Sequence, residues 1–218
     1  MRTEIIKVKG DWQEVVDDCR ITVSKPPLGH EPSNEFKQAI LIAEHSPIRN
    51  ISIKWVWRGI KSWIATHFSR SKWECFISTQ RTDRTGVDRD NLPQGALVNF
   101  TGEANTQHLI DTSRKRLCFC ASPETRKYWE DLKCEINKID PNIAQVMVPN
   151  CIYRFGCPEM GKCQFFKRFL DYAIMEGSYI SADKQTNTMD NISYRYKLYN
   201  EYFYERKRGE QHGNEQKD

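Results

Sequence analysis

The chain has 218 residues, of which 39% are hydrophobic, and a formal net charge of +4. This length and composition favour one soluble globular domain, and apolar runs such as Ala39–Ala43 are far too short to span a membrane. The charge is too small to indicate a nucleic-acid partner by itself. Acidic residues interrupt the N-terminal segment where a signal peptide needs an apolar core, so we expect a cytoplasmic protein.

The first half of the chain alternates short strand patterns with amphipathic helices. Apolar residues at helical spacing predict two helices, and Ser33 or Asn34 can cap the second one. A third helix is expected to open at Gly59, after a strand in which large apolar residues alternate with smaller or polar ones. The predicted helices are Asp11–Arg20, Asn34–Glu44 and Gly59–His67, and the predicted strands are Glu4–Lys9 and Ile51–Trp57.

The second half is predicted to be mainly helical. Turn residues and charges make Thr82–Gln94 a loop, and residues Cys151–Cys163 also lack a helical period. The predicted helices are Glu103–Leu117, Pro123–Ile139 with Ser122 as its cap, Gln164–Met175 and Asn191–Arg206. The polar residues from Gly209 onward are expected to be disordered. We therefore predict an α+β domain over residues 1–180, with helices packed on a small mixed or antiparallel sheet, and a C-terminal helix and polar tail over 181–218.

Basic residues crowd the segment between Arg70 and Arg116. Guanidinium groups bind phosphates and carbonyl oxygens through paired hydrogen bonds, so an anionic ligand could bind here. A helix that carries Asn105, Thr112 and Arg116 would present an amide and a guanidinium on one side. The alternative is a solvated surface with ordinary ion pairs. The chain has no phosphate-binding glycine loop and no nucleophile-elbow or zinc-protease motif.

Several motifs, in a fixed order, resemble those of the flavin-dependent thymidylate synthases, also called thymidylate synthase complementing proteins. That family has His-x-Ser/Thr-Pro, Gln-x-x-Arg-His-Arg, Ser-x-Arg, Arg-x-x-x-Pro, and a helix with spaced Asn, Asn and Arg. The corresponding segments here are Glu44-His45-Ser46-Pro47, His67-Phe68-Ser69-Arg70-Ser71-Lys72, Thr79-Gln80-Arg81, Arg89-Asp90-Asn91-Leu92-Pro93, and Asn105, Asp111 and Arg116. Residues Pro149–Cys163 look like the Cys-Pro-Glu-x-x-x-Cys ending of a divergent bacterial and bacteriophage branch.

The resemblance implies a homotetramer with shared active sites, in which FAD, NADPH and methylenetetrahydrofolate support methylation of dUMP to dTMP. By this resemblance the nucleotide-binding residues are His67, Arg70, Ser78, Thr79, Arg81, Arg89 and Arg116. Arg70 and Arg116 are also the expected catalytic residues, because cations can stabilise negative charge on the uracil ring. The expected flavin-binding residues are Ser46, Arg70, Ser71, Lys72, Asn105 and Asp111.

The chain departs from the family pattern at several places. Glu44 stands where the His-x-Ser/Thr-Pro segment begins with His, Arg49-Asn50 stands for the Glu-His after it, and His67 stands where the family usually has Gln. Ser71 stands where the family has His, Lys72 replaces Arg, Asp111 replaces Asn, and the segment between Arg81 and Arg89 is shorter than usual. Lys72 keeps the charge but loses the planar fork of donors. These departures leave two alternatives open: C5 modification of another pyrimidine nucleotide, or an arginine-rich nucleic-acid-binding module without flavin.

The eight cysteines are expected to be thiols, because a disulfide framework is untypical of a reducing compartment. Cys151, Cys157 and Cys163 are six residues apart and have no neighbouring histidine. A zinc site would therefore need to borrow Cys118 or Cys120. Buried or surface thiols are the favoured interpretation, and no metal ligand is assigned.

Overall fold

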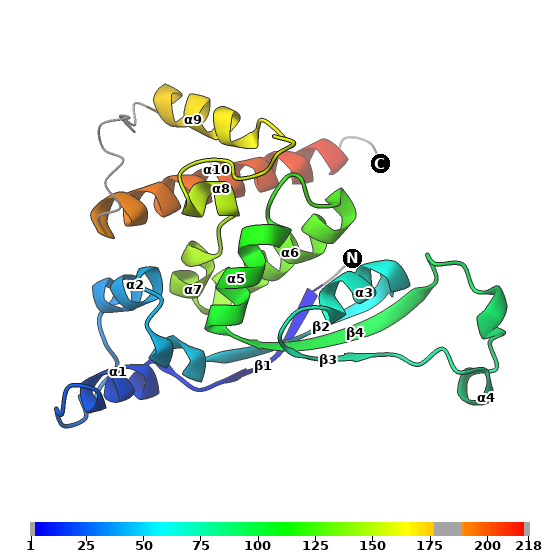
Figure 1. Ribbon diagram of the computed structural model, residues 1–218, viewed down its shortest axis with the longest axis horizontal. Coiled ribbons are helices and arrows are strands. Elements are labelled where there is room, and N and C mark those ends of the chain that lie inside the picture. Colours follow the sequence, from blue (N-terminus) through cyan, green and yellow to red (C-terminus); the bar gives the residue numbers. More distant parts are fainter. Residues whose placement is uncertain (1–2, 177–188, 216–218) are drawn as a thin grey trace.

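A four-stranded antiparallel sheet forms one layer of the molecule (Figure 1). The computed structural model describes residues 3–176 and 189–215. The strand order is β1-β2-β4-β3, where β1 is Thr3–Lys9, β2 is Ser52–Lys61, β3 is Glu74–Ile77 and β4 is Leu97–Asn105. Each neighbouring pair is antiparallel. The predicted α+β class with a small antiparallel sheet is confirmed.

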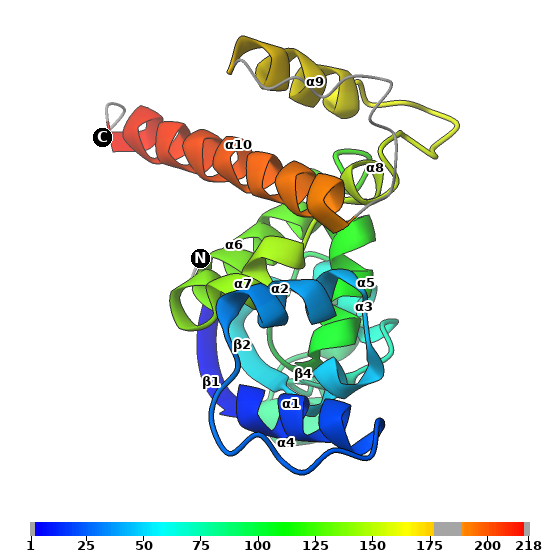
Figure 2. The ribbon, with the colours of Figure 1, turned by 90° about the vertical axis from the view of Figure 1, so that its left-hand side faces the viewer.

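Helices cover one face of this sheet in two layers. Figures 1 and 2 show α5, α6 and α7 between the sheet and α10, with α9 beside α10 on the outside. The helices are α1 Trp12–Ile21, α2 Asn34–Ile42, α3 Ser62–Ser69, α4 Thr82–Thr85, α5 Thr106–Arg116, α6 Pro123–Ile139, α7 Pro141–Val146, α8 Asn150–Tyr153, α9 Phe165–Met175 and α10 Met189–Glu215, with 3-10 turns η1 Ser46–Asn50 and η2 Arg89–Asn91. In this described part of the chain, no helix is long and apolar enough to cross a membrane.

The core between sheet and helices is built from large aromatic rings. Trp55 and Trp57 of β2 are fully buried and meet Trp129 of α6 edge to face, at centroid distances of 6.0 and 6.5 Å. Gly102 on β4 makes room for the first of these indoles, since a Cβ at that position would lie 2.5 Å from Cζ2 of Trp55. The aromatic core therefore fixes how β2, β4 and α6 pack.

Helix α10 is attached to α6 by a buried lysine and a buried carboxylate. Lys133 is completely buried and donates hydrogen bonds to the Ala144 carbonyl and, at 2.6 Å, to Oδ1 of Asn200. Glu130, also buried, pairs with Arg206 and Lys207 at 2.7 Å each. Both contacts join α6 to α10, so the C-terminal helix is an integral part of this helical layer.

Local capping explains where several helices begin. The side chain of Asp11 accepts from the Glu14 amide at 2.9 Å, and that of Ser33 accepts from the Phe36 amide at 3.3 Å, which confirms Ser33 as the cap of α2. Ser122 precedes α6 as predicted but makes no side-chain capping bond.

Several elements differ from the sequence prediction. Glu103–Asn105 end β4 and do not begin a helix, because the Asn105 side chain caps α5 by accepting from the His108 amide at 3.0 Å. Gly59, with φ of 65°, lies at an irregularity inside β2, and α3 begins only at Ser62. Strands β3 and β4 were not predicted.

The C-terminal prediction is also corrected in part. Helix α10 continues past Gly209 to Glu215, so residues 209–215 are not a disordered tail. Residues 216–218 and the expected domain boundary at 180/181 lie outside the described residues.

Candidate functional site

Three of the predicted nucleotide-binding residues meet where α3 and α5 end. Arg116, on the last turn of α5, donates from Nη2 to the His67 carbonyl oxygen of α3 at 3.0 Å. Its guanidinium also lies 5.7 Å from the centre of the Phe68 ring. Arg70 follows α3 directly, and its charge acts on both His67 and Arg116. We call His67, Arg70 and Arg116 the cationic cluster.

The cationic cluster carries positive charge that no described carboxylate neutralises. Over residues 3–176 and 189–215, neither Arg70 nor Arg116 forms an ion pair with Asp or Glu. Burial, and then the charge of Arg70, lowers the pKa of Arg116. Two guanidinium groups held close together without a counter-ion make a favourable place for an anion.

The surroundings of His67 in this cluster favour the neutral form of its imidazole. Burial lowers its pKa first, and the charges of Arg116 and Arg70 lower it further. Its Nδ1 lies 3.3 Å from Oγ1 of Thr125 on α6, and its ring lies 5.5 Å from that of Trp63. A neutral imidazole can donate one hydrogen bond and accept another, which suits a polar ligand beside the arginines.

The segment after α3 is fixed by aromatic packing on both sides. The amide of Ser71 donates to the Phe68 carbonyl at 3.1 Å, and Trp73 stacks on Trp129 at 5.4 Å with an interplanar angle of 10°. Ser71 is half-buried and Lys72 is exposed. Ser71 and Lys72 thus follow Arg70 on a short connection to β3, which the packing of Trp73 holds in place.

The remaining predicted flavin-binding residues lie around the junction of η1 and α5. Ser46 begins η1, Asn105 caps α5, and Asp111 lies on α5. The Thr106 amide donates to the Ile51 carbonyl at 2.9 Å, which joins the end of η1 to the start of α5. The structure therefore places these three residues on two elements that are directly bonded to each other.

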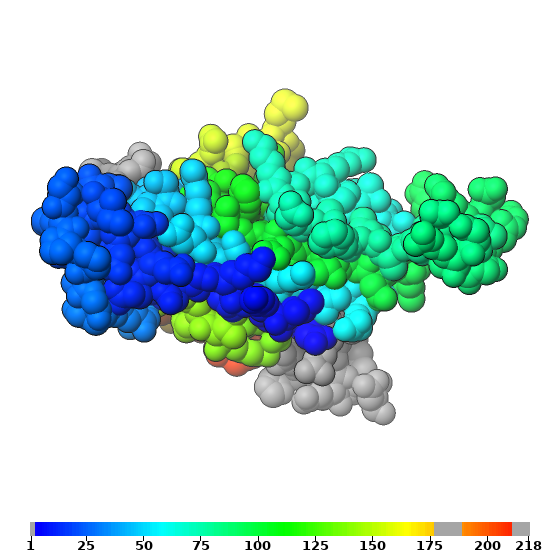
Figure 3. All heavy atoms as spheres, turned by 90° about the horizontal axis from the view of Figure 1, so that it is seen from below, coloured from blue at the N-terminus to red at the C-terminus, as the bar shows by residue number. Residues whose placement is uncertain are grey.

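The other four predicted nucleotide-binding residues are carried away from the cluster. Ser78, Thr79, Arg81 and Arg89 lie on residues 78–96, which we call the hairpin arm. Figures 1 and 3 show the arm extending away from the rest of the molecule. Its side chains bind one another, as Arg81 does with Asp83 at 2.7 Å, and Arg89 is exposed. A single copy of the chain does not bring the arm and the cationic cluster together.

One polar network next to the predicted residues was missed by the sequence analysis. Arg114 pairs with Glu44 and, at 3.1 Å, with Asp111, and its guanidinium stacks 3.7 Å from the centre of the Tyr153 ring. Gln107 donates to Glu44 at 2.6 Å. The spacing of three residues between Asp111 and Arg114 was the available signal for part of it. The contacts to Glu44 and Tyr153 are long-range and have no local pattern.

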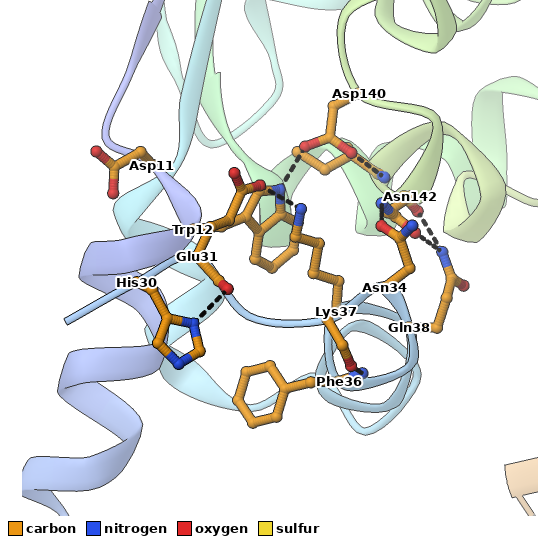
Figure 4. A network of polar contacts seen from close by, with 12 residues as sticks. Asp11, Trp12, His30, Glu31, Asn34, Phe36, Lys37, Gln38, Asp140 and Asn142 are labelled. Atoms are coloured by element: carbon orange, nitrogen blue, oxygen red, sulfur yellow. Dashed lines mark hydrogen bonds and ion pairs between the residues drawn. The ribbon is translucent and has the colours of Figure 1, made fainter. Parts of the chain in front are cut away.

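A separate cavity of about 880 Å³ lies among α1, α2, α7 and α10. Figure 4 shows polar contacts along it: Trp12 donates to Asp140 at 2.7 Å, and Gln38 donates to Asn142 at the same distance. Lys37 pairs with Glu31 at its edge. None of the predicted site residues lines this cavity, so it is distinct from the cationic cluster.

Comparisons with known proteins support the fold. The sequence matches no family model, and no curated protein matches it. Among solved structures, the fold is similar to flavin-dependent thymidylate synthase ThyX from Helicobacter pylori, complexed with FAD and dUMP, with a TM-score of 0.57, 9% identity, and coverage of 68% of this chain and 100% of that one. It is also similar to the UMP/dUMP methylase PolB from Streptomyces cacaoi, bound with 5-Br dUMP, with a TM-score of 0.53, 12% identity, and coverage of 66% and 93%. The chain thus has the fold of these two proteins over about two thirds of its length.

Proposed function

We propose that this protein is a flavin-dependent methyltransferase that acts on C5 of a pyrimidine nucleotide, with dUMP as the favoured substrate. The observation that carries the proposal is the cationic cluster, in which Arg70 and Arg116 lack a described carboxylate partner. It occurs on a fold shared with proteins whose structures hold dUMP or 5-Br dUMP. A nucleotide monophosphate brings the anion that such a cluster favours.

In this proposal the cluster residues bind and polarise the nucleotide. Arg70 and Arg116 contact the phosphate or a uracil carbonyl oxygen and stabilise the negative charge that develops as the ring becomes nucleophilic. The imidazole of His67, whose lowered pKa favours the neutral form, donates or accepts one further hydrogen bond. No side chain of the protein has to attack the ring, which agrees with a site made of cations and an imidazole.

The residues expected to hold FAD fit a group that carries phosphates. Arg70 and Lys72 provide cations, and Ser46 and Ser71 provide hydroxyl groups. Asp111 is paired with Arg114, so the guanidinium partly neutralises its negative charge and reduces its repulsion of a phosphate. When bound, the flavin supplies the hydride, after reduction by NADPH, and methylenetetrahydrofolate supplies the carbon unit. A cytoplasmic location, where these small molecules occur, is part of the proposal.

We infer that the hairpin arm completes the site of another copy of the chain. Arg81, Arg89, Ser78 and Thr79 lie on the arm and not near the cluster of their own copy. In a homotetramer, which the family resemblance implies, the arm of one copy can reach the cationic cluster of its neighbour. Sharing of the site between two copies would bring all seven predicted nucleotide-binding residues to one place.

UMP is the second candidate substrate. One structural neighbour is described as a methylase of both UMP and dUMP, although it is only 12% identical to this chain. The two nucleotides differ by the ribose 2′-hydroxyl, so they share the phosphate and the base that the cluster would contact. A comparison of their affinities and rates separates the two substrates.

The first test is the absorption spectrum of the purified protein, followed by calorimetric titration with dUMP and UMP. We expect a flavin band and nucleotide binding, and Arg116→Ala should weaken that binding by about 1.5–3 kcal/mol, or roughly ten- to a hundredfold. Lys115→Ala is the matched control, because Lys115 is an exposed cation on the same helix. Protein that binds single-stranded nucleic acid but neither flavin nor mononucleotide would contradict the proposal.

A further inference from the structure

His67 of the cationic cluster is held at three points, and one of them is a hydroxyl group on α6. Arg116 donates to the His67 carbonyl oxygen at 3.0 Å, and the Trp63 ring meets the imidazole edge to face at 5.5 Å. The third point is Thr125, whose Oγ1 lies 3.3 Å from Nδ1. This contact leaves Nε2 as the ring nitrogen that can meet a ligand. The position of the ring proton therefore decides whether His67 donates to that ligand or accepts from it.

The place of Thr125 in its helix indicates that its hydroxyl donates to His67. Thr125 is the third residue of α6 and is completely buried, so its hydroxyl hydrogen needs an acceptor inside the protein. The first turn of a helix has free N–H groups, which are donors and cannot accept this hydrogen. The Ser122 carbonyl, three residues back, already accepts from the Arg126 amide at 2.9 Å. The acceptor within reach is Nδ1 of His67.

The N-terminus of α6 favours the same arrangement. The aligned peptide dipoles of this 17-residue helix place partial positive charge at the first turn, where Thr125 lies. That charge attracts a lone pair on Nδ1 and would repel an N–H there. Burial, and then the charges of Arg116 and Arg70, lower the pKa of His67 and favour the neutral ring, which carries one proton. We therefore expect that proton on Nε2.

We propose that Thr125 is a positioning residue that holds His67 in the tautomer with its proton on Nε2, so that the imidazole donates a hydrogen bond to an acceptor oxygen of the nucleotide. The ligand part of this inference rests on the proposed function. Arg70 and Arg116 also can only donate, because a guanidinium has no acceptor atom. The cluster then presents donors alone. Such a set suits phosphate oxygens and uracil carbonyl oxygens and disfavours a group that itself donates, such as the amino group of cytosine.

The experiment reads the tautomer directly, by nitrogen NMR of the full chain with isotope-labelled histidines. The two ring nitrogens of a neutral imidazole give separate signals according to which one carries the proton, and His67→Gln identifies the signals of His67. We expect the proton on Nε2 in the ligand-free wild type and in Thr125→Ser, which keeps the hydroxyl. Thr125→Val, which loses it, should give a mixture of both tautomers. A proton on Nδ1 in the wild type would overturn the proposal.

The matched control is Thr66→Val. Thr66 precedes His67 on α3, but its side chain is exposed and its hydroxyl donates to the Ser62 carbonyl at 3.1 Å. Removing this hydroxyl should leave the tautomer of His67 unchanged. A change of equal size in Thr66→Val and Thr125→Val would contradict a specific role of Thr125.

Calorimetric titration then tests what the donor binds. Thr125→Val should weaken dUMP binding about two- to tenfold, as expected for the loss of one hydrogen bond, and Thr125→Ser should keep most of the affinity. Separate titrations with inorganic phosphate and with deoxyuridine show which oxygen His67 meets, because the weakening follows the molecule that carries this oxygen. Unchanged dUMP affinity in Thr125→Val would overturn the ligand part of the proposal. Protein that binds no mononucleotide would contradict the proposed function, while the NMR measurement would still decide the role of Thr125.

Discussion

Lys133 is a fully buried amine that forms no ion pair with a carboxylate in the part of the chain that the structure describes. Its Nζ lies 5.3 Å from the centre of the Phe203 ring and 5.8 and 5.9 Å from those of Tyr204 and Tyr199. The two hydrogen-bond acceptors near it, the Ala144 carbonyl and Asn200, are uncharged. Burial lowers the pKa of Lys133 from its ordinary value to about 7.

This pKa makes stability depend on pH through one residue. In the unfolded chain Lys133 takes up its proton below about pH 10.4, whereas the folded protein resists that proton until about pH 7. The unfolded state therefore binds more protons between these values, and the free energy of unfolding rises with pH there, by up to about 1.4 kcal/mol per pH unit. Lys133→Met should lose this rise, while Lys138→Met, on an exposed part of α6, should keep it. Urea unfolding of the three proteins at pH 7, 8 and 9 gives the comparison, and parallel curves for wild type and Lys133→Met would contradict it.

Ser71 is the residue whose departure from the family pattern bears most directly on turnover. It is half-buried beside Arg70, in the place where the resemblance expects a histidine. If the missing imidazole acts mainly in the transition state, Ser71→His should raise the rate of dUMP-dependent NADPH oxidation with little change in nucleotide affinity. Steady-state kinetics and calorimetry measure the two effects separately. An unchanged rate with intact flavin binding would show that position 71 has no such role.

The sequence predicted part of the site at this scale. His67, Arg70 and Arg116 are close in space as the ordered motifs suggest, because the first two lie on one helical end and the third reaches them from α5. Their functional roles remain predictions. Glu44, which stands where the His-x-Ser/Thr-Pro motif begins with His, is a partner of Arg114, and no local pattern could show a contact across seventy residues.

At the scale of elements, amphipathic helices were easier to predict than strands. Helix α6 was predicted with its observed limits, since Pro123 starts it and buried residues recur along it. Strand β4 was missed although alternate residues are buried from Val98 to Ala104. Its buried positions include Gly102, which is small because the Trp55 indole occupies the space above it. A glycine needed for packing therefore weakened the alternation that marks a strand.

A buried carboxylate, Glu130, is one of the polar side chains that link α6 to α10. Glu130 pairs with Arg126 at 3.3 Å in addition to Arg206 and Lys207 of α10, and its side chain is 5% exposed. Glu130→Gln would remove the carboxylate partner of Arg126 and leave Arg206 and Lys207 paired only with Glu210 of their own helix. Breaking a buried pair in this way costs about 3–5 kcal/mol. We expect a loss of that size in urea unfolding, and faster amide exchange along α10.

The matched control on the same helix is Glu135→Gln. Glu135 pairs with Lys138 at 2.7 Å, but the lysine side chain is 67% exposed. Exposed pairs contribute no more than about 1 kcal/mol, so this variant should unfold almost like wild type. Equal losses in the two variants would show that burial of the Glu130 carboxylate does not matter for the docking of α10.

At the scale of the whole molecule, our proposal divides the active site between copies of the chain. The cationic cluster lies on the helical body, whereas Arg81 and Arg89 lie on the hairpin arm. The resemblance implies active sites shared between subunits, but motif order along the chain does not say which copy supplies each motif. A site assembled from two copies makes flavin and nucleotide binding depend on oligomerisation.

This division predicts that two inactive variants restore each other. Arg89→Ala removes a side chain of the arm and Arg116→Ala removes one of the cluster, so each protein alone should have little activity. In a mixed oligomer some sites combine an intact arm from one variant with an intact cluster from the other. If subunits exchange freely at equal concentrations, about a quarter of the sites should be complete, with a matching fraction of wild-type activity. The control is a mixture of Arg70→Ala with Arg116→Ala, both in the cluster, which should stay inactive. Recovery in neither mixture, although gel filtration and mass spectrometry show mixed oligomers, would place the arm and the cluster of one site in the same copy.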